Sequence, residues 1–282
     1  AWVRLERTDN EPSQFLKYVL TALQQCAENL DWAALEAVES AREVNLSLIS
    51  SLLVNDLNAL EQPILLVLED YHLIDNPAID ALVESLLQQA IQTLHLVITA
   101  REDPGLPLAH LRVKNQLTEI RAADLRFSLD EAIEFFTKVM SIHLSEAQVA
   151  ALAQRTEGWA AGLQLAALSL KDNQDPETFI RAFRGTHRHV LDYLLEEVLY
   201  GQTEEVRSFL CQTSILDQLS APLCEAVTGQ KNCPQLLRDL ERSNLFLVPL
   251  DDHRTWYRYH VLFAELLKNQ LMQTEPDRWD DL

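Results

Sequence analysis

Two acidic residues and one arginine stand at the ends of two neighbouring apolar runs. Glu69 and Asp70 follow the aliphatic run 64–68, and Arg101 follows the run 94–99, about one helix further along the chain. The run 64–68 is continuously aliphatic, which is typical of a buried parallel strand, and the second apolar run indicates the next strand. Because open α/β sheets bind ligands beyond the carboxyl ends of their strands, the pattern predicts a site for phosphate and a metal ion at this edge.

The same pattern occurs in P-loop ATPases, where an acid at a strand end, the Walker B acid, holds magnesium. Arg101 suits the terminal phosphate because a guanidinium is a planar fork of donors; the alternative is a surface ion pair with Glu102 or Asp103, which stabilises little. The Gly-rich loop G-x-x-x-x-G-K-[ST], which cradles phosphates, does not occur in the chain, whose first glycine is Gly105. The sequence therefore predicts a P-loop-type sheet without its first segment.

Strands and helices alternate over residues 1–126. Strands are expected at 1–5, 64–68, 94–99 and 117–125, and helices are expected after Pro12 with Asn10 as the cap, over 46–60, after Asn76-Pro77 and after Pro107. This alternation predicts a parallel sheet with both faces covered.

The pattern is helical from Ser128 onward. Capping boxes begin at Ser128 and Ser145, and four or five helices follow residue 186, with β-type runs at 245–250 and 256–260. We predict an α/β part followed by an all-α part. The expected domains are a partial nucleotide-binding domain over 1–126, a helical domain over 127–185 and a winged-helix domain over 186–282.

Charge and composition exclude several classes of function. Forty-three acidic residues against 23 Lys plus Arg give a net charge of −20, so we expect no direct binding to DNA phosphates; the basic residues within 181–189 are too few to reverse this. The chain has no membrane-length apolar run and no signal segment. Its four cysteines form no C-x-x-C pair, which predicts buried free thiols and a reducing cytoplasm.

Six segments, in order along the chain, resemble the nucleotide-binding core of the MalT-type regulators. These proteins are large LuxR-family transcription activators of the STAND class of signalling ATPases. The segments are AWVRLE at 1–6, VLEDYHLI at 67–74, LVITAR at 96–101, LPLAHLR at 106–112, TEGWAAGLQL at 156–165 and WYRYHVLF at 256–263.

The resemblance implies roles for single residues. Glu69 would hold magnesium and Asp70 would orient the attacking water. Both residues are therefore candidates for the metal site and for catalysis. The family usually has Asp where this chain has Glu69, and Mg²⁺ tolerates little displacement of a ligand. His260, where the last helix begins, would contact the β-phosphate of ADP, the alternative being a packed core histidine. Gly162 and Gln164 would lie near adenine, the alternative being close helix packing.

The resemblance also implies a switch that is ADP-bound and closed at rest and that oligomerises with ATP when induced. ATP or ADP and Mg²⁺ would serve the full-length parent, whereas this chain alone is expected to bind no nucleotide and to be inactive as an ATPase. Its expected partners are further copies of itself or other domains of the same regulator. The rival hypothesis is a nucleotide-free interaction module with the same fold, and a mechanical AAA-type ATPase fits the 156–165 and 256–263 segments poorly.

Overall fold

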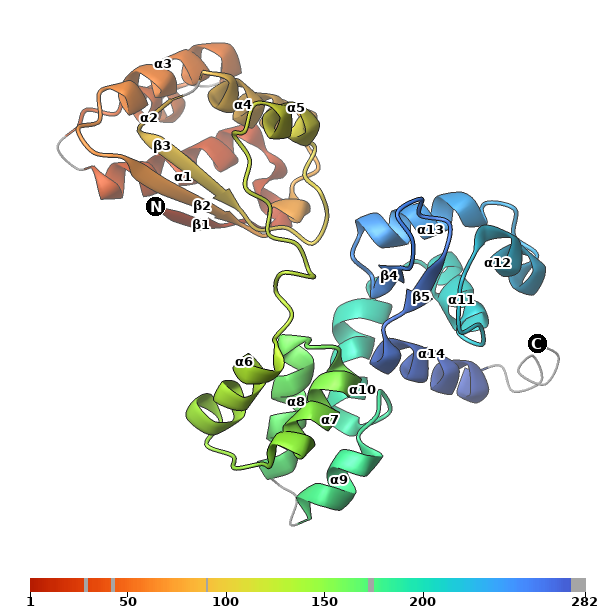
Figure 1. Ribbon diagram of the computed structural model, residues 1–282. Coiled ribbons are helices and arrows are strands. Elements are labelled where there is room, and N and C mark those ends of the chain that lie inside the picture. The colour runs from red at the N-terminus through yellow and green to blue at the C-terminus, as the bar shows by residue number, and fades with distance from the viewer. Residues whose placement is uncertain (28–29, 42–43, 90, 172–174, 275–282) are drawn as a thin grey trace. The chain divides into compact units, whose positions relative to one another are not determined.

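The chain folds into two units, Ala1–Thr118 and Glu119–Leu282. The computed structural model describes residues 1–27, 30–41, 44–89, 91–171 and 175–274 (Figure 1). Within this described part, no helix is long and apolar enough to cross a membrane.

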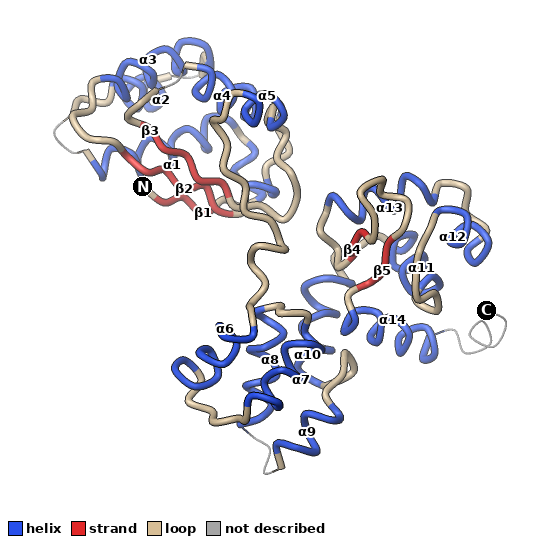
Figure 2. Tube along the Cα trace, viewed as in Figure 1, coloured by secondary structure: helices blue, strands red, loops and turns tan. Residues whose placement is uncertain are grey.

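A three-stranded parallel sheet organises the first unit. Its strands are β1 (Trp2–Arg4), β2 (Ile64–Glu69) and β3 (Leu94–Ile98), in the order β1-β2-β3 (Figure 2). In the register, Val67 lies between Trp2 and Val97. The strands at 1–5, 64–68 and 94–99 are thus confirmed, and because all three run parallel, their carboxyl ends lie at one edge of the sheet.

The helices of the first unit form one core with the sheet. They are α1 (Pro12–Cys26), α2 (Ala33–Ser40), α3 (Leu46–Asn58), α4 (Pro77–Gln88) and α5 (Leu108–Val113). The amphipathic face of α1 is buried, as the helical spacing of its apolar residues requires. The cap of α4 is Asn76, whose side chain accepts from the N–H of Ala78. Glu11, not the predicted Asn10, precedes α1, and α2 was not predicted.

One face of the sheet is not covered by the described residues. Trp2, Leu65 and Val97, which share that face by register and alternation, are 65%, 52% and 41% exposed, whereas Val67, which lies between Trp2 and Val97, is 7% exposed. The opposite face, with Val3, Leu66 and Leu68, belongs to the core. The prediction that helices cover both faces is therefore wrong for this part of the chain.

The predicted strand at 117–125 is also wrong. The backbone N–H of Arg121 donates to the side chain of Asp124, and the N–H of Asp124 donates back to the carbonyl of Arg121. These two bonds close a turn, which uses the groups that a ladder would need. Ile120 and Leu125 are 68% and 64% exposed, so burial of these side chains does not stabilise an extended conformation of the segment. The boundary between the two units falls within this segment.

The second unit begins with five helices. They are α6 (Leu129–Glu134), α7 (Glu146–Thr156), α8 (Ala160–Lys171), α9 (Pro176–Ala182) and α10 (Arg188–Leu194), with wider π-helical turns continuing α6 and α10. The capping boxes at Ser128 and Ser145 are both formed, each with reciprocal side-chain and backbone bonds. Both predicted helix starts are confirmed.

Helices, a hairpin and a last helix complete the second unit. The elements are α11 (Glu204–Thr213), α12 (Ala221–Thr228), α13 (Cys233–Arg242), β4 (Leu247–Pro249), β5 (Tyr257–Tyr259) and α14 (Val261–Thr274). The β4–β5 pair is antiparallel, which confirms the expected hairpin.

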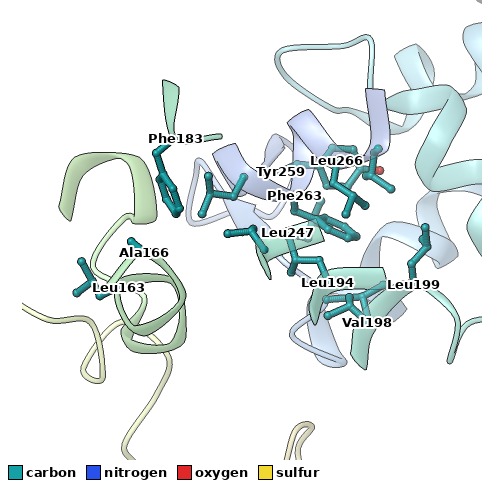
Figure 3. Packing of buried hydrophobic residues seen from close by; sticks show 14 of the residues in the cluster. Leu163, Ala166, Phe183, Leu194, Val198, Leu199, Leu247, Tyr259, Phe263 and Leu266 are labelled. Atoms are coloured by element: carbon teal, nitrogen blue, oxygen red, sulfur yellow. The ribbon is translucent and has the colours of Figure 1, made fainter. Parts of the chain in front are cut away.

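Residues on both sides of position 185 share one hydrophobic core. Leu163, Ala166 and Phe183 belong to the same buried cluster as Leu194 and Phe263 (Figure 3). The helical and winged segments therefore fold around common apolar contacts, and their division into two domains at residue 185 stays a prediction.

Candidate functional site

The first cluster of polar residues lies at the carboxyl edge of the sheet. Glu69 ends β2, and the N–H of Asp70 donates to the hydroxyl of Thr99, 3.2 Å away, just beyond β3. The N–H of Tyr71 donates to the carbonyl of Thr99 at 3.0 Å. The loop after β2 is thus tied to the residue two positions before Arg101, as the strand order predicts.

Both acids already have partners in the first unit. The indole N–H of Trp2 donates to Glu69 Oε2 at 2.9 Å, and Arg4 Nε lies 3.4 Å from Asp70 Oδ2. Asp70 has a φ of 62°, a left-handed conformation that is unfavourable for residues with a side chain and that concentrates at functional sites. Among the described residues, no three His, Cys, Asp or Glu side chains form a group able to hold a metal. The two carboxylates alone are therefore an incomplete metal site.

His72 is a member of this cluster that the sequence analysis missed. Burial lowers its pKa first, and the charge of Arg101 lowers it further, while Asp70 and Glu102 act in the opposite direction. Its Nδ1 atom is buried without a hydrogen-bond partner. Arg101 itself is exposed. Because Arg101 and Asp70 both shift the pKa of His72, both side chains lie within electrostatic range of its imidazole.

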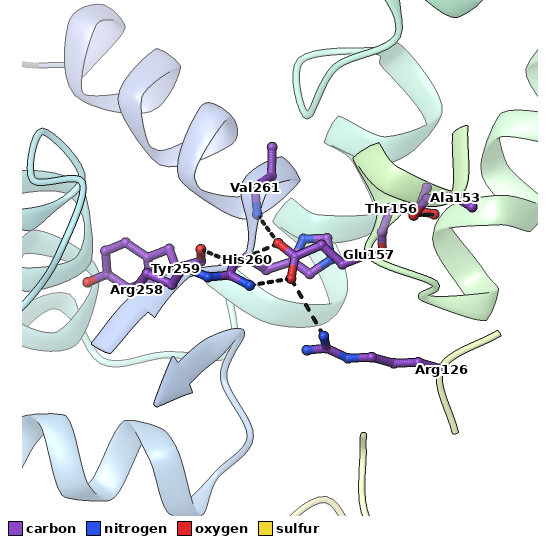
Figure 4. Close-up of polar contacts among 8 residues, drawn as sticks. All are labelled: Arg126, Ala153, Thr156, Glu157, Arg258, Tyr259, His260 and Val261. Atoms are coloured by element: carbon purple, nitrogen blue, oxygen red, sulfur yellow. Dashed lines mark hydrogen bonds and ion pairs between the residues drawn. The ribbon is translucent and has the colours of Figure 1, made fainter. Parts of the chain in front are cut away.

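The second cluster centres on Glu157, in the second unit (Figure 4). Glu157 ends α7 in a left-handed conformation with a φ of 50°. Arg258 of β5 donates to both of its carboxylate oxygens, at 2.7 Å each. The N–H of Val261, in the first turn of α14, donates to Oε1 at 3.1 Å, and Arg126 Nη1 lies 3.7 Å from Oε2. One carboxylate therefore joins α7, the hairpin, α14 and the segment before α6.

These contacts determine the charge state of Glu157, whose side chain is 11% exposed. Burial by itself would raise the pKa of Glu157. The hydrogen bonds from Arg258, the charge that His260 carries when its ring is protonated, the N–H of Val261 and the charge of Arg258 outweigh burial and lower the pKa to about 2. Glu157 is therefore a buried anion that its surroundings hold in the charged form.

His260 lies beside Glu157 and is 5% exposed. Its Nε2 atom is 2.9 Å from the carbonyl oxygen of Thr156. Because a carbonyl only accepts, Nε2 carries the proton of the neutral ring, and Nδ1 is left buried without a partner. The rings of Trp159 and Phe246 contact the imidazole edge-on. Burial lowers the pKa of His260, although Glu157 opposes this.

Gly162 and Gln164 lie on α8 near this cluster in sequence. A Cβ at Gly162 would approach the Cε3 atom of Trp159 to 2.7 Å, so the glycine permits the indole to pack against the helix. Gln164 is exposed. The adenine contact expected for both residues stays a prediction, and the packing requirement explains Gly162 without it.

Glu157 itself was missed by the sequence analysis. Its position after a capped helix and before Gly158 indicates only a helix end. Its partner Arg258 is 101 residues away, and no local pattern links the two. The sequence signal for the Glu157–Arg258 pair is weak: it consists of an acid at a helix end and an arginine two residues before His260.

Comparison with known proteins gives a match to a family model and matches to curated relatives. A family model described as the MalT winged helix domain matches residues 195–279. The chain is 34% identical over 271 residues to the HTH-type transcriptional regulator MalT of Klebsiella pneumoniae subsp. pneumoniae and 36% identical over 272 residues to that of Cronobacter sakazakii. Each match covers 95% of this chain and 30% of the relative. The chain thus spans about a third of the length of these curated regulators.

The comparison of structures gives a fold. A Walker-type ATPase of Pyrococcus abyssi superposes with a TM-score of 0.61 at 13% identity, over 95% of this chain and 84% of that chain. This likeness supports a P-loop-type α/β fold followed by helices, in agreement with the predicted fold class.

Proposed function

We propose that this chain, which matches the MalT winged helix domain over residues 195–279 and is similar to MalT regulators over 95% of its length, is the nucleotide-switch core of a signal-responsive transcriptional regulator. The observation that carries the proposal is the position of Glu69 and Asp70 beside Thr99, two residues before Arg101, at the carboxyl edge of a parallel sheet. Open α/β sheets bind their ligands at this edge.

The residues at the edge fit part of a magnesium–nucleotide site. Mg²⁺ is usually bound by one or two protein carboxylates, with phosphate oxygens and waters completing the octahedron. Glu69 and Asp70 would supply the carboxylates, and Arg101 would meet the terminal phosphate. Magnesium would neutralise phosphate charge when bound. Trp2 and Arg4 now contact the two carboxylates and would have to yield to the metal.

The second cluster supports a switch rather than a rigid scaffold. His260 and Glu157 join the end of α7 to the start of α14 through a few polar contacts, and such contacts can be exchanged for contacts with a ligand. We place the ADP-closed resting state, and oligomerisation with ATP on induction, on this arrangement. In this proposal the segment acts in the cytoplasm through copies of itself or other domains of the regulator, without contacting DNA.

Nucleotide binding tests the proposal directly. The chain would be extended upstream by the genomic sequence that precedes it, where that sequence encodes G-x-x-x-x-G-K-[ST], and titrated with Mg-ATP and Mg-ADP. Arg101→Ala should weaken ATP more than ADP, by about ten-fold, because one charged hydrogen bond to the terminal phosphate is lost. Lys17→Ala, an exposed cation on α1, should leave both affinities unchanged. Equal affinities in all three proteins would refute the role of Arg101.

His260 tests the switch. In the full-length regulator, His260→Ala should raise inducer-independent activation and speed ADP release. The reason is that a hydrogen bond to a charged phosphate contributes about 1.5–3 kcal/mol, which is enough to shift the closed–open equilibrium about ten-fold or more. The thermal midpoint of the ADP-free protein should also fall, because the His260 ring is 5% exposed and its Nε2 lies 2.9 Å from the Thr156 carbonyl, so the rate of ADP release is the deciding measurement. A large fall in that midpoint with unchanged ADP release would show that His260 serves only the core.

A nucleotide-free interaction module is the second candidate. The exposed sheet face with Trp2, Leu65 and Val97 favours it, since contiguous apolar surface marks interaction sites. The titration above separates the candidates: an extended chain with the phosphate-binding loop that binds neither nucleotide would support the module.

A further inference from the structure

Strand β1 lies at an edge of the parallel sheet and pairs with β2 on one side only (Figure 2). The N–H of Leu5 donates to the carbonyl of Glu69 at 2.9 Å, and the N–H of Val67 donates to the carbonyl of Ala1 at 3.0 Å. Because successive residues of a strand direct their backbone groups to opposite sides, the odd-numbered residues of β1 serve β2. The even-numbered residues therefore direct their N–H and C=O groups away from the sheet.

These outward groups belong to Trp2 and Arg4. Among the described residues, no hydrogen bond to the backbone N–H or C=O of either residue is found. Trp2 is 65% exposed, and the side chain of Arg4 is 74% exposed. A row of unpaired backbone groups at a sheet edge is a template for another strand. The edge of β1 can therefore take a further strand.

A groove of about 390 Å³ lies along this edge. It is lined by β1 and the turn that follows, and by Tyr18, Thr21, Ala22 and Gln25, which form one face of α1. The side chains of Thr21 and Ala22 are small, so α1 leaves space beside the strand. Tyr18 is 48% exposed, and exposed aromatic side chains are enriched at protein interfaces. The surroundings of the edge thus suit a protein partner.

The backbone of the edge is complementary to itself. In an antiparallel pair of two β1 strands centred on Val3, Trp2 of each copy lies opposite Arg4 of the second copy. Residues that face each other in this way exchange both of their N–H···O bonds when their backbone groups point toward the partner. The outward N–H and C=O groups of Trp2 and Arg4 in both copies would all be satisfied by this one register.

The side chains of the edge are complementary in charge. The indole N–H of Trp2 donates to Glu69 Oε2 at 2.9 Å, and Asp70 Oδ2 lies 3.4 Å from Arg4 Nε. A second copy would bring its own Arg4 to the exposed indole of Trp2, beside the Glu69 carboxylate. A guanidinium is attracted both by the face of an indole and by a carboxylate. These charges favour an identical strand as the occupant of the edge.

We propose that two copies of this chain associate through their β1 edges, antiparallel about Val3, so that the two sheets become one. The contact is isologous, as in most symmetric dimers, because each copy uses the same surface. This inference rests on the proposed function only in naming a surface for its self-association. It requires no nucleotide, so an experiment without nucleotide tests it separately.

Sedimentation equilibrium of the nucleotide-free chain over a range of concentrations should show a dimer. Arg4→Pro removes an outward N–H but no bond to β2, and proline is tolerated at such edge positions. It should weaken dimerisation about ten-fold or more, because one bond is lost in each of two pairs. Arg4→Glu should also weaken it, by placing a carboxylate beside Glu69, and Arg4→Lys should weaken it less than Arg4→Glu. Arg7→Ala removes an exposed cation outside the groove and should change nothing.

Hydrogen exchange locates the contact without any substitution. In the wild-type chain, protection of the Arg4 N–H should rise with protein concentration, whereas the Leu5 N–H, which donates to Glu69, should be protected at all concentrations. A chain that stays monomeric would overturn the proposal. So would a dimer in which exchange at Arg4 does not depend on concentration, or an Arg4→Pro dimer as stable as the wild type.

Discussion

Replacing Glu157 with glutamine should destabilise the second unit. Glutamine keeps the length and one acceptor oxygen, but it removes the charge that Arg258 contacts through two bonds of 2.7 Å and that Arg126 approaches to 3.7 Å. Removing one member of a buried pair leaves the other without compensation. The substitution therefore isolates the charge of Glu157 from its packing.

The pKa of Glu157 gives the magnitude. Its pKa is about 2 against an ordinary value of 4.5, and because one unit corresponds to about 1.4 kcal/mol, the folded state favours the charged form by about 3 kcal/mol. Since the Arg258 side chain is 31% exposed, solvent screening reduces the expected loss to about 2 kcal/mol. For a unit of this size the thermal midpoint should fall by about 4–8 °C.

Differential scanning calorimetry, with hydrogen exchange at the Val261 amide to assign the transition, measures the effect. Glu177→Gln is the matched control, because Glu177 pairs with Arg181 on the surface at 66% and 78% side-chain exposure; its midpoint should fall by no more than about 1–2 °C. A midpoint for Glu157→Gln equal to that of the control would refute the reasoning.

The pH dependence gives a second check with a definite sign. Because folding lowers the pKa of Glu157, its stabilisation is complete above about pH 4.5 and is lost as the pH falls toward about 2. The difference in stability between the wild-type chain and Glu157→Gln should therefore shrink across this window. A difference that stays constant would indicate a packing effect unrelated to charge.

Other predictions follow from the same structure. Gly185→Ala should lower the thermal midpoint of the second unit by several degrees, because its Cβ would lie 1.8 Å from the carbonyl oxygen of Leu262. Gly201→Ala, whose Cβ would have no atom nearer than 3.9 Å, should be neutral or stabilising in the same thermal scan. A thiol reagent should modify exposed Cys26 well before buried Cys224, whose pKa burial raises to about 12, and equal rates would contradict this burial. The chain by itself should give no saturable heat with Mg-ATP in the micromolar range, since it contains no G-x-x-x-x-G-K-[ST] loop, and clear binding would reveal a different phosphate cradle. It should not retard random duplex DNA at physiological salt with its net charge of −20, and salt-sensitive retention at sub-micromolar protein would be evidence against that expectation.

Local sequence determined most elements of the fold. The capping boxes at Ser128 and Ser145 start helices because each satisfies N–H groups within four residues. The apolar runs that become β2 and β3 are fixed by the core face of each strand, to which Leu66, Leu68 and the partly buried Leu94, Leu96 and Ile98 belong, although Leu65 and Val97 stay exposed. The segment 117–125 was the exception: its apolar residues suggested a strand, but no neighbouring strand pairs with it and a turn forms instead.

Only the tertiary structure decided what these elements bring together. The amino-acid order places Glu69, Asp70 and Arg101 at strand ends, and the parallel register alone makes those ends neighbours, so this cluster was predictable. Glu157 and Arg258 are 101 residues apart, and His260 and Thr156 are 104 residues apart. Their pairing depends on how α7 packs against the hairpin and α14, which is set by the shared hydrophobic core and not by any local pattern. Sequence periodicity specifies which face of an element is apolar, whereas packing of those faces determines which distant charges meet.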